Sequence, residues 1–168
     1  MPLGGCGEIG MNLNLFGHDG RWLMVDCGVT FEETPQGNEV QMPDPHFISE
    51  RAESLVGIVA THAHMDHIGA LPYLADQFGC PIYTTPFTAA VLAPKLREAR
   101  SKAVVNIVHP GQSLALGPFQ LTWLPITHST PETNGLFIET AAGNIVHTAD
   151  WKIDPTPVVG QGLSLIHI

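Results

Sequence analysis

Thr61-His62-Ala63-His64-Met65-Asp66-His67 contains four side chains that bind metal ions through nitrogen or oxygen, and they fall within six residues. An apolar run at 55–60 precedes this segment, and an apolar stretch with helical spacing follows it at 68–74. The pattern indicates a buried strand that leads into the segment and a helix that leads away from it. The segment is therefore expected to present its polar side chains at the end of a strand.

The spacing of these side chains predicts metal binding. Because His62 and His64 are two residues apart, they project the same way from extended backbone and can hold one ion. Asp66 and His67 are adjacent, and they can face a second ion close to the first. Imidazole and carboxylate groups are ligands of zinc and similar first-row ions. The alternative is that Asp66 caps the following helix, but a cap requires one such residue and not four.

The size and composition of the chain predict one globular domain. With 168 residues it can bury one core, but not two comfortable ones. Hydrophobic residues make up 44% and charged residues 14%, which excludes a disordered or fibrous chain. No apolar run reaches membrane-spanning length, and no signal segment is recognisable. Three cysteines without CxxC spacing, Cys6, Cys27 and Cys80, favour reduced thiols in the cytoplasm.

The net charge of -9 argues against a generic nucleic-acid-binding protein, which usually has a basic surface. Two divalent ions would add about four positive charges where a substrate binds, and this weakens the objection. Four of the seven basic residues also fall in one short helical stretch: Lys95, Arg97, Arg100 and Lys102. That cluster either contacts a phosphate backbone or forms a solvated helix face, and the second reading is favoured.

Turns and apolar patterns divide the rest of the chain into short elements. Pro35, Pro43 and Pro45 indicate an irregular excursion loop at 30–50. The expected helices are 66–78, which stops at Gly79, and 86–102, with a break at Pro94. The expected strands are 12–16, 21–25, 81–84, 104–108, 113–116, 119–124, 136–140 and 144–148.

Two features near the N-terminus each leave two readings open. The glycine-rich stretch 4–10 lacks the Lys-Ser/Thr pair and the following helix of a phosphate loop, which excludes a nucleotide site. It is either a tight loop that passes close to the metal centre or a plain turn. Asp26 ends the apolar strand 21–25. It either orients a metal-ligating histidine from behind or accepts hydrogen bonds from loop backbone donors.

Two further ligand candidates follow predicted strands, as His62 does. His128 comes after the strand 119–124, and Asp150 comes after the strand 144–148. Because ligands at the ends of separate strands can converge, both are expected to join the central segment. The other histidines have no further ligand candidates near them in this pattern, and they are expected to be structural or surface residues: His18, His46, His109 and His147.

The segment HAHMDH, His62 to His67, resembles the HxHxDH signature of the metallo-β-lactamase superfamily, and a later histidine and aspartate follow in the expected order. Longer segments resemble the ribonuclease J family, which joins this domain to a β-CASP insertion: 3–12, 25–28, 62–74 and 147–155. The resemblance implies an α/β fold, a four-layer αββα sandwich. Residues 1–161 would form the N-terminal part of that domain, and residues 162–168 are expected to be a non-native tail.

The resemblance also implies two divalent ions, expected to be zinc, with manganese and magnesium as alternatives. The implied ligands are His62, His64 and His128 for the first ion, Asp66 and His67 for the second, and Asp150 for both. A hydroxide that bridges the ions would attack the scissile phosphorus, so Asp66 and Asp150 share the catalytic role with it. Ser129 matches the family's His-Ser pair, where it either holds phosphate or serves as a turn hydroxyl.

By the same resemblance, the intact protein hydrolyses RNA phosphodiester bonds as a 5′–3′ exonuclease and endonuclease in RNA processing and decay. It would act on single-stranded RNA in the cytoplasm, without a membrane, and as a homo-oligomer. Two alternatives remain open: a small-substrate hydrolase of the thioesterase or lactonase type, and an inactive metal-binding fragment. The second follows because the family's last metal-ligating histidine and its proton donor are expected beyond this chain. Met65, Ala149 and Trp151 also replace an acidic residue, a glycine and a phenylalanine that are common in the family.

Overall fold

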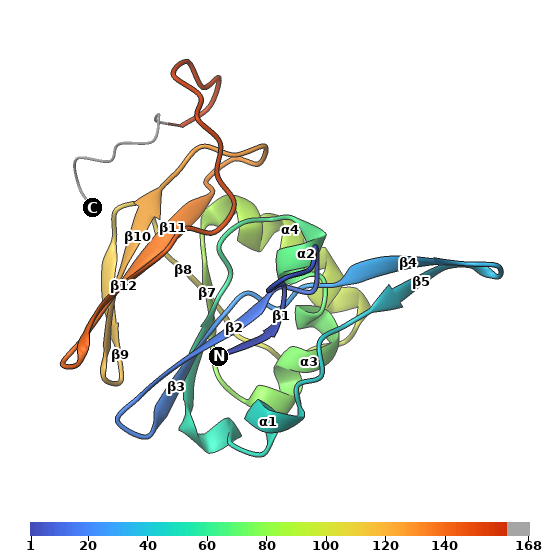
Figure 1. Ribbon diagram of the computed structural model, residues 1–168, viewed down its shortest axis with the longest axis horizontal. Helices are drawn as coiled ribbons and strands as arrows, with labels where there is room; N and C mark the ends of the chain where they lie inside the picture. Colours follow the sequence, from blue (N-terminus) through green and yellow to red (C-terminus); the bar gives the residue numbers. More distant parts are fainter. Residues whose placement is uncertain (161–168) are drawn as a thin grey trace.

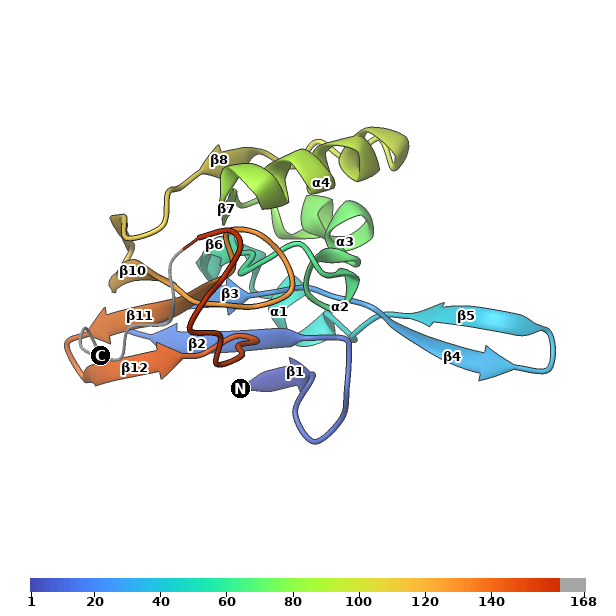
Figure 2. The same cartoon turned by 90° about the horizontal axis from the view of Figure 1, so that it is seen from above.

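Two β-sheets packed face to face form the body of the protein, and helices cover the outer face of one sheet (Figure 1). The computed structural model describes residues 1–160 of the chain. The view from above shows the helices α3 and α4 side by side on the same face of the body (Figure 2). The predicted tail at 162–168 lies outside the described residues.

The larger sheet has six strands in the order β1-β2-β3-β6-β7-β8. The strands β1 to β3 pair antiparallel, whereas β3, β6, β7 and β8 run parallel to one another. Parallel neighbours need crossover connections, and these connections carry the helices. The strands are β1 (Pro2–Gly4), β2 (Leu13–His18), β3 (Arg21–Val25), β6 (Leu55–Val59), β7 (Ile82–Thr84) and β8 (Val105–Ile107).

The smaller sheet has four antiparallel strands in the order β12-β11-β10-β9. Its central pair is long and carries most of the apolar side chains that face the larger sheet. These strands are β9 (Ser113–Leu116), β10 (Phe119–Pro125), β11 (Asn134–Thr140) and β12 (Gly143–His147). A separate two-stranded hairpin consists of β4 (Thr30–Thr34) and β5 (Gly37–Gln41).

The central strands of the larger sheet are buried on both faces. Met24 and Ile58 pack toward the helices, whereas Leu23, Val25 and Val59 pack toward the smaller sheet. This alternation follows from the two-residue period of a strand and explains why β3 and β6 are almost wholly apolar. The helices are α1 (His46–Ser49), the 3-10 helix η1 (Ala52–Ser54), α2 (Met65–Ile68), α3 (Leu71–Phe78) and α4 (Pro86–Glu98).

The α/β class predicted from the sequence is confirmed, and the described residues supply one helical layer and both sheets of the sandwich. Within residues 1–160, no helix lies on the outer face of the smaller sheet (Figure 1). None of the helices in this part of the chain has the length and apolar character needed to cross a bilayer.

Both predicted helices differ from the observed ones at their boundaries. The expected helix at 66–78 is two helices, α2 and α3, with a break at Gly69. It ends as predicted at Gly79, whose φ of 63° lies in the left-handed region that favours glycine. The second helix continues past Pro94 without the expected break and ends at Glu98, before Arg100 adopts a φ of 56°.

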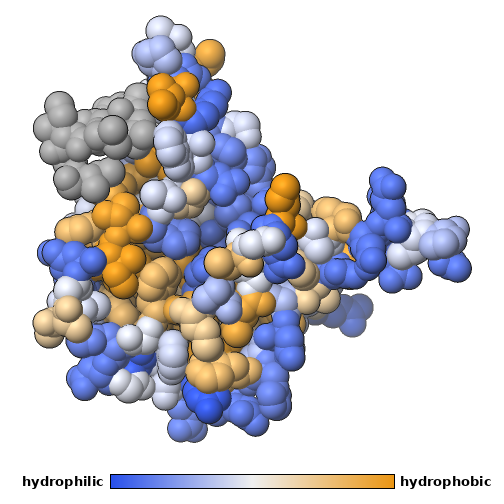
Figure 3. Space-filling model, in the orientation of Figure 1, coloured by the Kyte–Doolittle hydropathy of each residue, from blue (hydrophilic) through white to orange (hydrophobic). Residues whose placement is uncertain are grey.

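The prediction of an irregular loop at 30–50 was wrong, because β4 and β5 form a hairpin that projects from the body (Figures 1 and 2). Its prolines lie in the turn and after the second strand, where they leave the pairing intact. The projecting end is largely hydrophilic (Figure 3). A cavity of about 400 Å³ borders the hairpin, α3 and α4, with Phe31, Val40 and Tyr73 among its walls.

Candidate metal centre

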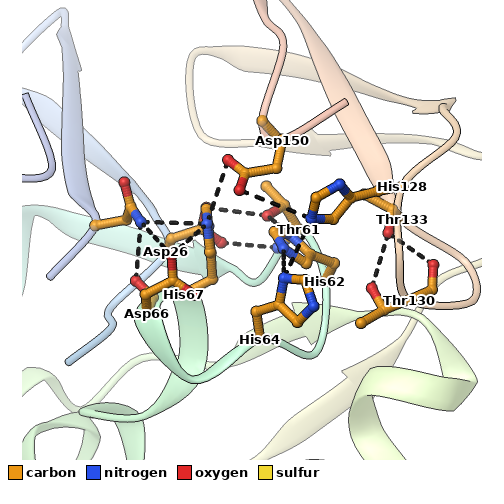
Figure 4. A network of polar contacts seen from close by, with 12 residues as sticks. Asp26, Thr61, His62, His64, Asp66, His67, His128, Thr130, Thr133 and Asp150 are labelled. Carbon is orange, nitrogen blue, oxygen red and sulfur yellow. Dashed lines mark hydrogen bonds and ion pairs between the residues drawn. The ribbon is translucent and has the colours of Figure 1, made fainter. Parts of the chain in front are cut away.

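A group of three histidines and one aspartate lies where the two sheets meet above the ends of their strands (Figure 4). His64 Nδ1 lies 3.0 Å from His62 Nε2 and 3.2 Å from His128 Nε2. Asp150 Oδ2 lies 3.8 Å from His128 Nε2. One ligand atom from each of the four residues falls within 4.8 Å of the others, so this group could hold one ion.

The spacing of the ring nitrogens fits a divalent first-row metal. Tetrahedral bonds of about 2.0–2.1 Å to zinc place two ligand nitrogens about 3.3 Å apart. The observed separations of 3.0 and 3.2 Å around His64 are close to that value. Three imidazole nitrogens and a carboxylate oxygen are also a donor set that such ions accept.

A second group contains Asp66, His67 and Asp150. His67 Nε2 lies 3.5 Å from Asp66 Oδ2 and 3.4 Å from Asp150 Oδ1. The two oxygens of Asp150 therefore face different groups, Oδ1 toward His67 and Oδ2 toward His128. The arrangement can hold two ions side by side with one carboxylate between them.

Each of these side chains follows an element that fixes its position. The strand β6 ends at Val59, directly before Thr61 and His62. The helix α2 presents Asp66 and His67 in its single turn, with His64 at its N-cap. No side chain caps α2, so Asp66 does not have the capping role that was the alternative reading. The segments that carry His128 and Asp150 follow β10 and β12.

The backbone around α2 is held by the segment that follows β3. Cys27 N–H donates to His67 O at 2.8 Å, and the Val29 N–H donates to Met65 O at 3.0 Å. Gly28 lies between these bonds, and a Cβ there would come within 1.6 Å of Asp66 O. Only glycine leaves room for this approach, which places Asp26 directly behind the histidines.

Asp26 is buried, contacts His67 of the second group directly, and reaches His62 of the first group through Thr61. Its Oδ2 lies 2.7 Å from His67 Nδ1 and accepts the Thr61 hydroxyl at 3.0 Å, while its Oδ1 accepts the Thr61 N–H at 2.8 Å. The Thr61 Oγ1 is also 3.0 Å from His62 Nδ1. These contacts occupy the Nδ1 sides of both rings and leave the Nε2 atoms of His62 and His67 facing the ligand groups.

The same contacts determine the charges of the metal-free protein. Burial disfavours the charged form of Asp26, but the charge and hydrogen bond of His67 outweigh burial and lower the pKa of the carboxyl. Burial also opposes protonation of His67, yet Asp26 and Asp66 raise its pKa to about 10. Burial, with the charge of His67, lowers the pKa of His62 to about 3. His62 is therefore neutral and His67 is a cation, which must release a proton before its Nε2 can bind a metal.

Asn12 belongs to the site, although no sequence pattern indicated a role for it. Its Nδ2 donates to Asp66 O at 3.0 Å and lies 3.4 Å from Asp66 Oδ2 and 3.2 Å from His67 Nε2. The glycine-rich stretch 4–10 packs against Asn12, since a Cβ on Gly5 would come within 2.2 Å of Asn12 Oδ1. Of the two readings of that stretch, the structure therefore favours a tight loop next to the site.

Ser129 lies at the edge of the first group, where its Oγ is 3.2 Å from His64 Nε2. A cavity of about 380 Å³ extends from His128 and Ser129 to the segment after β12. Lys152 lines this cavity and forms an ion pair with Asp154 at 3.1 Å, and no sequence pattern indicated either feature. The cavity thus joins hydroxyl groups and a cation to the candidate metal centre.

The residues expected to be structural lie outside the two groups. His46 is exposed and pairs with Glu50 at 3.4 Å, while the ring of His18 packs against Phe119. Three members of the basic cluster are exposed at the end of α4 and beyond it: Arg97, Arg100 and Lys102. Among the described residues they form no ion pair, in keeping with a solvated helix face.

Comparisons with known proteins give a consistent family assignment. A family model described as a β-lactamase superfamily domain matches residues 21–163. A ribonuclease J from Sinorhizobium meliloti is 45% identical over 169 residues, which cover 95% of this chain and 30% of that protein. A ribonuclease J from Mycobacterium tuberculosis is 39% identical over 165 residues, with 97% and 30% covered. The chain thus spans about a third of the length of these relatives.

Solved structures show the same fold at lower identity. The metallo-β-lactamase fold protein YhfI from Bacillus subtilis has a TM-score of 0.59 and 24% identity, over 86% of this chain and 56% of that one. The short form of human tRNase Z has a TM-score of 0.57 and 17% identity, over 86% and 64%. At this level of identity the likeness concerns the fold alone.

Proposed function

The chain belongs to the β-lactamase superfamily, and on this premise, with curated relatives that are ribonucleases J, we propose that it serves metal-dependent hydrolysis of RNA phosphodiester bonds. The observation that carries the proposal is the position of Asp150, whose two oxygens face two separate groups of ligands. Such a pair of sites suits an in-line displacement at phosphorus. We expect the intact protein to act on single-stranded RNA, in the cytoplasm and as a homo-oligomer.

The proposed metal ligands are those that the geometry gathers: His62, His64, His128 and Asp150 for one ion, and Asp66, His67 and Asp150 for the other. When bound, two divalent ions, zinc in our expectation and otherwise manganese or magnesium, supply Lewis acidity toward the phosphoryl oxygens and lower the pKa of water. In this proposal Asp66 and Asp150 carry the catalytic role, because Asp66 would hold the second ion and Asp150 would face both.

The surrounding residues fix these ligands in place. Asp26 accepts a hydrogen bond from the Nδ1–H of His67, so that Nε2 of this ring points at Asp66 and Asp150. Thr61 contacts both Asp26 and Nδ1 of His62, so it restricts the orientation of the His62 ring as well. Asn12 donates to the backbone oxygen of Asp66 and holds the turn of α2. Ring orientations set before binding reduce the cost of ordering the site when the ions and the substrate arrive.

The substrate is proposed to enter beside His128. The cavity there is lined by Ser129, Thr130 and Lys152, which offer hydroxyl donors and a cation to a phosphate of the chain. Ser129 is the residue that we assign to phosphate contact. Because the protein carries a net charge of -9 and Asp154 pairs with Lys152, the bound ions would supply most of the local positive charge that an RNA strand needs.

The test uses the protein loaded with zinc or manganese and a 3′-labelled single-stranded RNA with a 5′-monophosphate. In the intact protein we expect metal-dependent hydrolysis, and His64→Ala should abolish it by removing the first ion while the fold persists, as judged by circular dichroism. Near-normal hydrolysis by His64→Ala at matched metal loading would overturn the ligand assignment. Intact RNA together with turnover of a thioester or lactone would instead identify a small-substrate hydrolase.

One observation favours a second candidate, a protein that binds metal without turnover. Within residues 1–160, the second group offers three ligating residues, whereas the first offers four. A weakly held second ion would leave the reaction without one of its two Lewis acids. Tight binding of one metal equivalent, with neither RNA nor small substrates hydrolysed, would establish this candidate in place of the ribonuclease.

A further inference from the structure

Asp150 is carried by a sharp turn after β12. Ala149, directly before it, has a φ of 48°, in the left-handed region where a side chain with a Cβ is strained. The backbone N–H of Ala149 donates to Nδ1 of His147 at 3.3 Å. The histidine at the end of the strand therefore receives the first backbone donor of the turn.

Little else fixes the carboxylate of Asp150. In the described part of the chain, its oxygens contact only His67 and His128, and no hydroxyl or backbone N–H donates to them. The side chain is also half-exposed, so packing does not immobilise it. Its position between the two ligand groups must therefore come from the backbone of the turn.

His147 is itself held firmly enough to anchor that turn. It pairs with Leu136 in β11, and its ring lies edge-on to Phe16 with centroids 5.9 Å apart. Its backbone lies against β11, because a Cβ on Gly135 would come within 2.9 Å of His147 O. On the far side of the turn, the Lys152 N–H donates to Thr127 O at 2.8 Å. The turn that carries Asp150 is thus held on one side by His147 and on the other by the hydrogen bond from Lys152 to Thr127.

We propose that His147 is a positioning residue, whose ring nitrogen holds the Ala149 turn so that Asp150 reaches both ligand groups. The inference rests on the proposed two-ion function, because Asp150 has this task only if both groups bind metal. The competing view is that the ring of His147 merely fills space against Phe16. The two views differ in whether the nitrogen acceptor or the ring volume matters.

Two substitutions separate these views. His147→Asn places an amide oxygen close to the position of Nδ1 and keeps an acceptor for Ala149, although it removes the ring. His147→Phe keeps a ring against Phe16 and removes the acceptor. The matched control is His18→Phe. His18 also packs edge-on to a phenylalanine, Phe119, but it is not followed in the chain by a candidate metal ligand.

The first measurement is zinc or manganese binding by competition with a chelator, at fixed pH. We expect His147→Phe to weaken binding by about 10-fold to 100-fold, the range seen when a group that orients a metal ligand is lost. His147→Asn should stay within about threefold of the unmodified chain, and His18→Phe should be unchanged. Thermal unfolding of the metal-free variants should show similar midpoints for His147→Phe and His18→Phe.

The second measurement needs no metal and no substrate. Amide hydrogen exchange at Ala149 should be slow in the unmodified chain and in His147→Asn, and fast in His147→Phe. Unchanged exchange and metal affinity in His147→Phe would overturn the inference, as would equal losses in His147→Asn and His147→Phe. If the pattern holds while RNA stays intact, the positioning role stands and the ribonuclease function fails. If the unmodified chain binds neither ion, both fail.

Discussion

Asp26 Oδ2 lies 2.7 Å from His67 Nδ1 in a pair of side chains that are both almost fully buried. The same oxygen accepts the hydroxyl of Thr61, which in turn contacts His62. One carboxylate therefore orients a histidine in each ligand group. Asp26 also has a φ of 64°, and strained backbone of this kind persists only where the surroundings enforce it.

Replacement of Asp26 by asparagine should weaken metal binding at both groups. The amide keeps the shape of the side chain but loses the charge that holds His67 and Thr61, and an effect of about 10-fold to 100-fold is expected. Competition with a chelator measures it. The control is Asp19→Asn, because Asp19 also has a positive φ, of 47°, but is exposed and lies outside the two candidate ligand groups. Equal metal affinities in the two variants would show that Asp26 has no orienting role.

Gly28→Ala should destabilise the fold severely. The added Cβ would meet Asp66 O at 1.6 Å, and this oxygen belongs to the backbone and cannot move aside. The free energy of unfolding should therefore fall by about 3 kcal/mol or more. Gly7→Ala is the comparison, because Gly7 has a φ of 83° and open space around it. Its cost should be about 1 kcal/mol of backbone strain. Urea unfolding gives both values, and a smaller effect at Gly28 than at Gly7 would contradict the structure.

Ala149→Gly should raise stability, because glycine adopts the observed φ of 48° without strain. The gain should reach up to about 1 kcal/mol, since the greater freedom of glycine in the unfolded chain offsets part of the relief. Ala142→Gly, in an exposed turn where φ is not positive, should instead lower stability. Thermal unfolding of both variants measures these changes. A loss of stability in Ala149→Gly as large as that in Ala142→Gly would rule out strain at this turn.

The three cysteines should react with a thiol reagent in a fixed order. Burial raises the pKa of Cys80 to about 11, so at pH 8 only about one molecule in a thousand carries its thiolate. Cys6 is exposed and should react first, whereas burial raises the pKa of Cys27 and encloses its sulfur in the core.

Mass spectrometry after timed alkylation measures this order. The rate at Cys80 should rise about tenfold for each pH unit between 8 and 10, because the thiolate fraction grows with pH until the pKa is reached. Alkylation of Cys27 as fast as that of Cys6 in the folded protein would contradict the burial seen in the structure.

The clustering of the candidate ligands could be predicted because their signals are local. His62, His64, Asp66 and His67 lie in one contiguous segment at the end of an apolar run, and the spacing alone indicates their chemistry. His128 also follows a recognisable strand. The convergence of these residues with Asp150 then depends only on the order of strands in two sheets.

The features that were missed depend on contacts that leave no local pattern. Asn12 reaches Asp66 across 54 positions of the chain, and nothing in its own neighbourhood indicates that contact. The hairpin β4–β5 was hidden because its strands are mostly exposed on both faces, so apolar and polar residues do not alternate along it. The close approach of Val29 to Gly69, where a Cβ would meet its side chain at 2.7 Å, likewise leaves no local pattern.

The projecting hairpin has a consequence for how the chain tolerates changes of length. Phe31 and Val40 are paired across β4 and β5, and both border the cavity beside α3 and α4. Because side chains along a strand alternate between faces, adding or removing an even number of residues in each strand preserves the face that they present. An odd number, placed between this pair and the body, turns both side chains away from that cavity. Odd and even changes of strand length should therefore differ in their effect on this cavity, while the candidate metal ligands, carried by other elements, keep their arrangement.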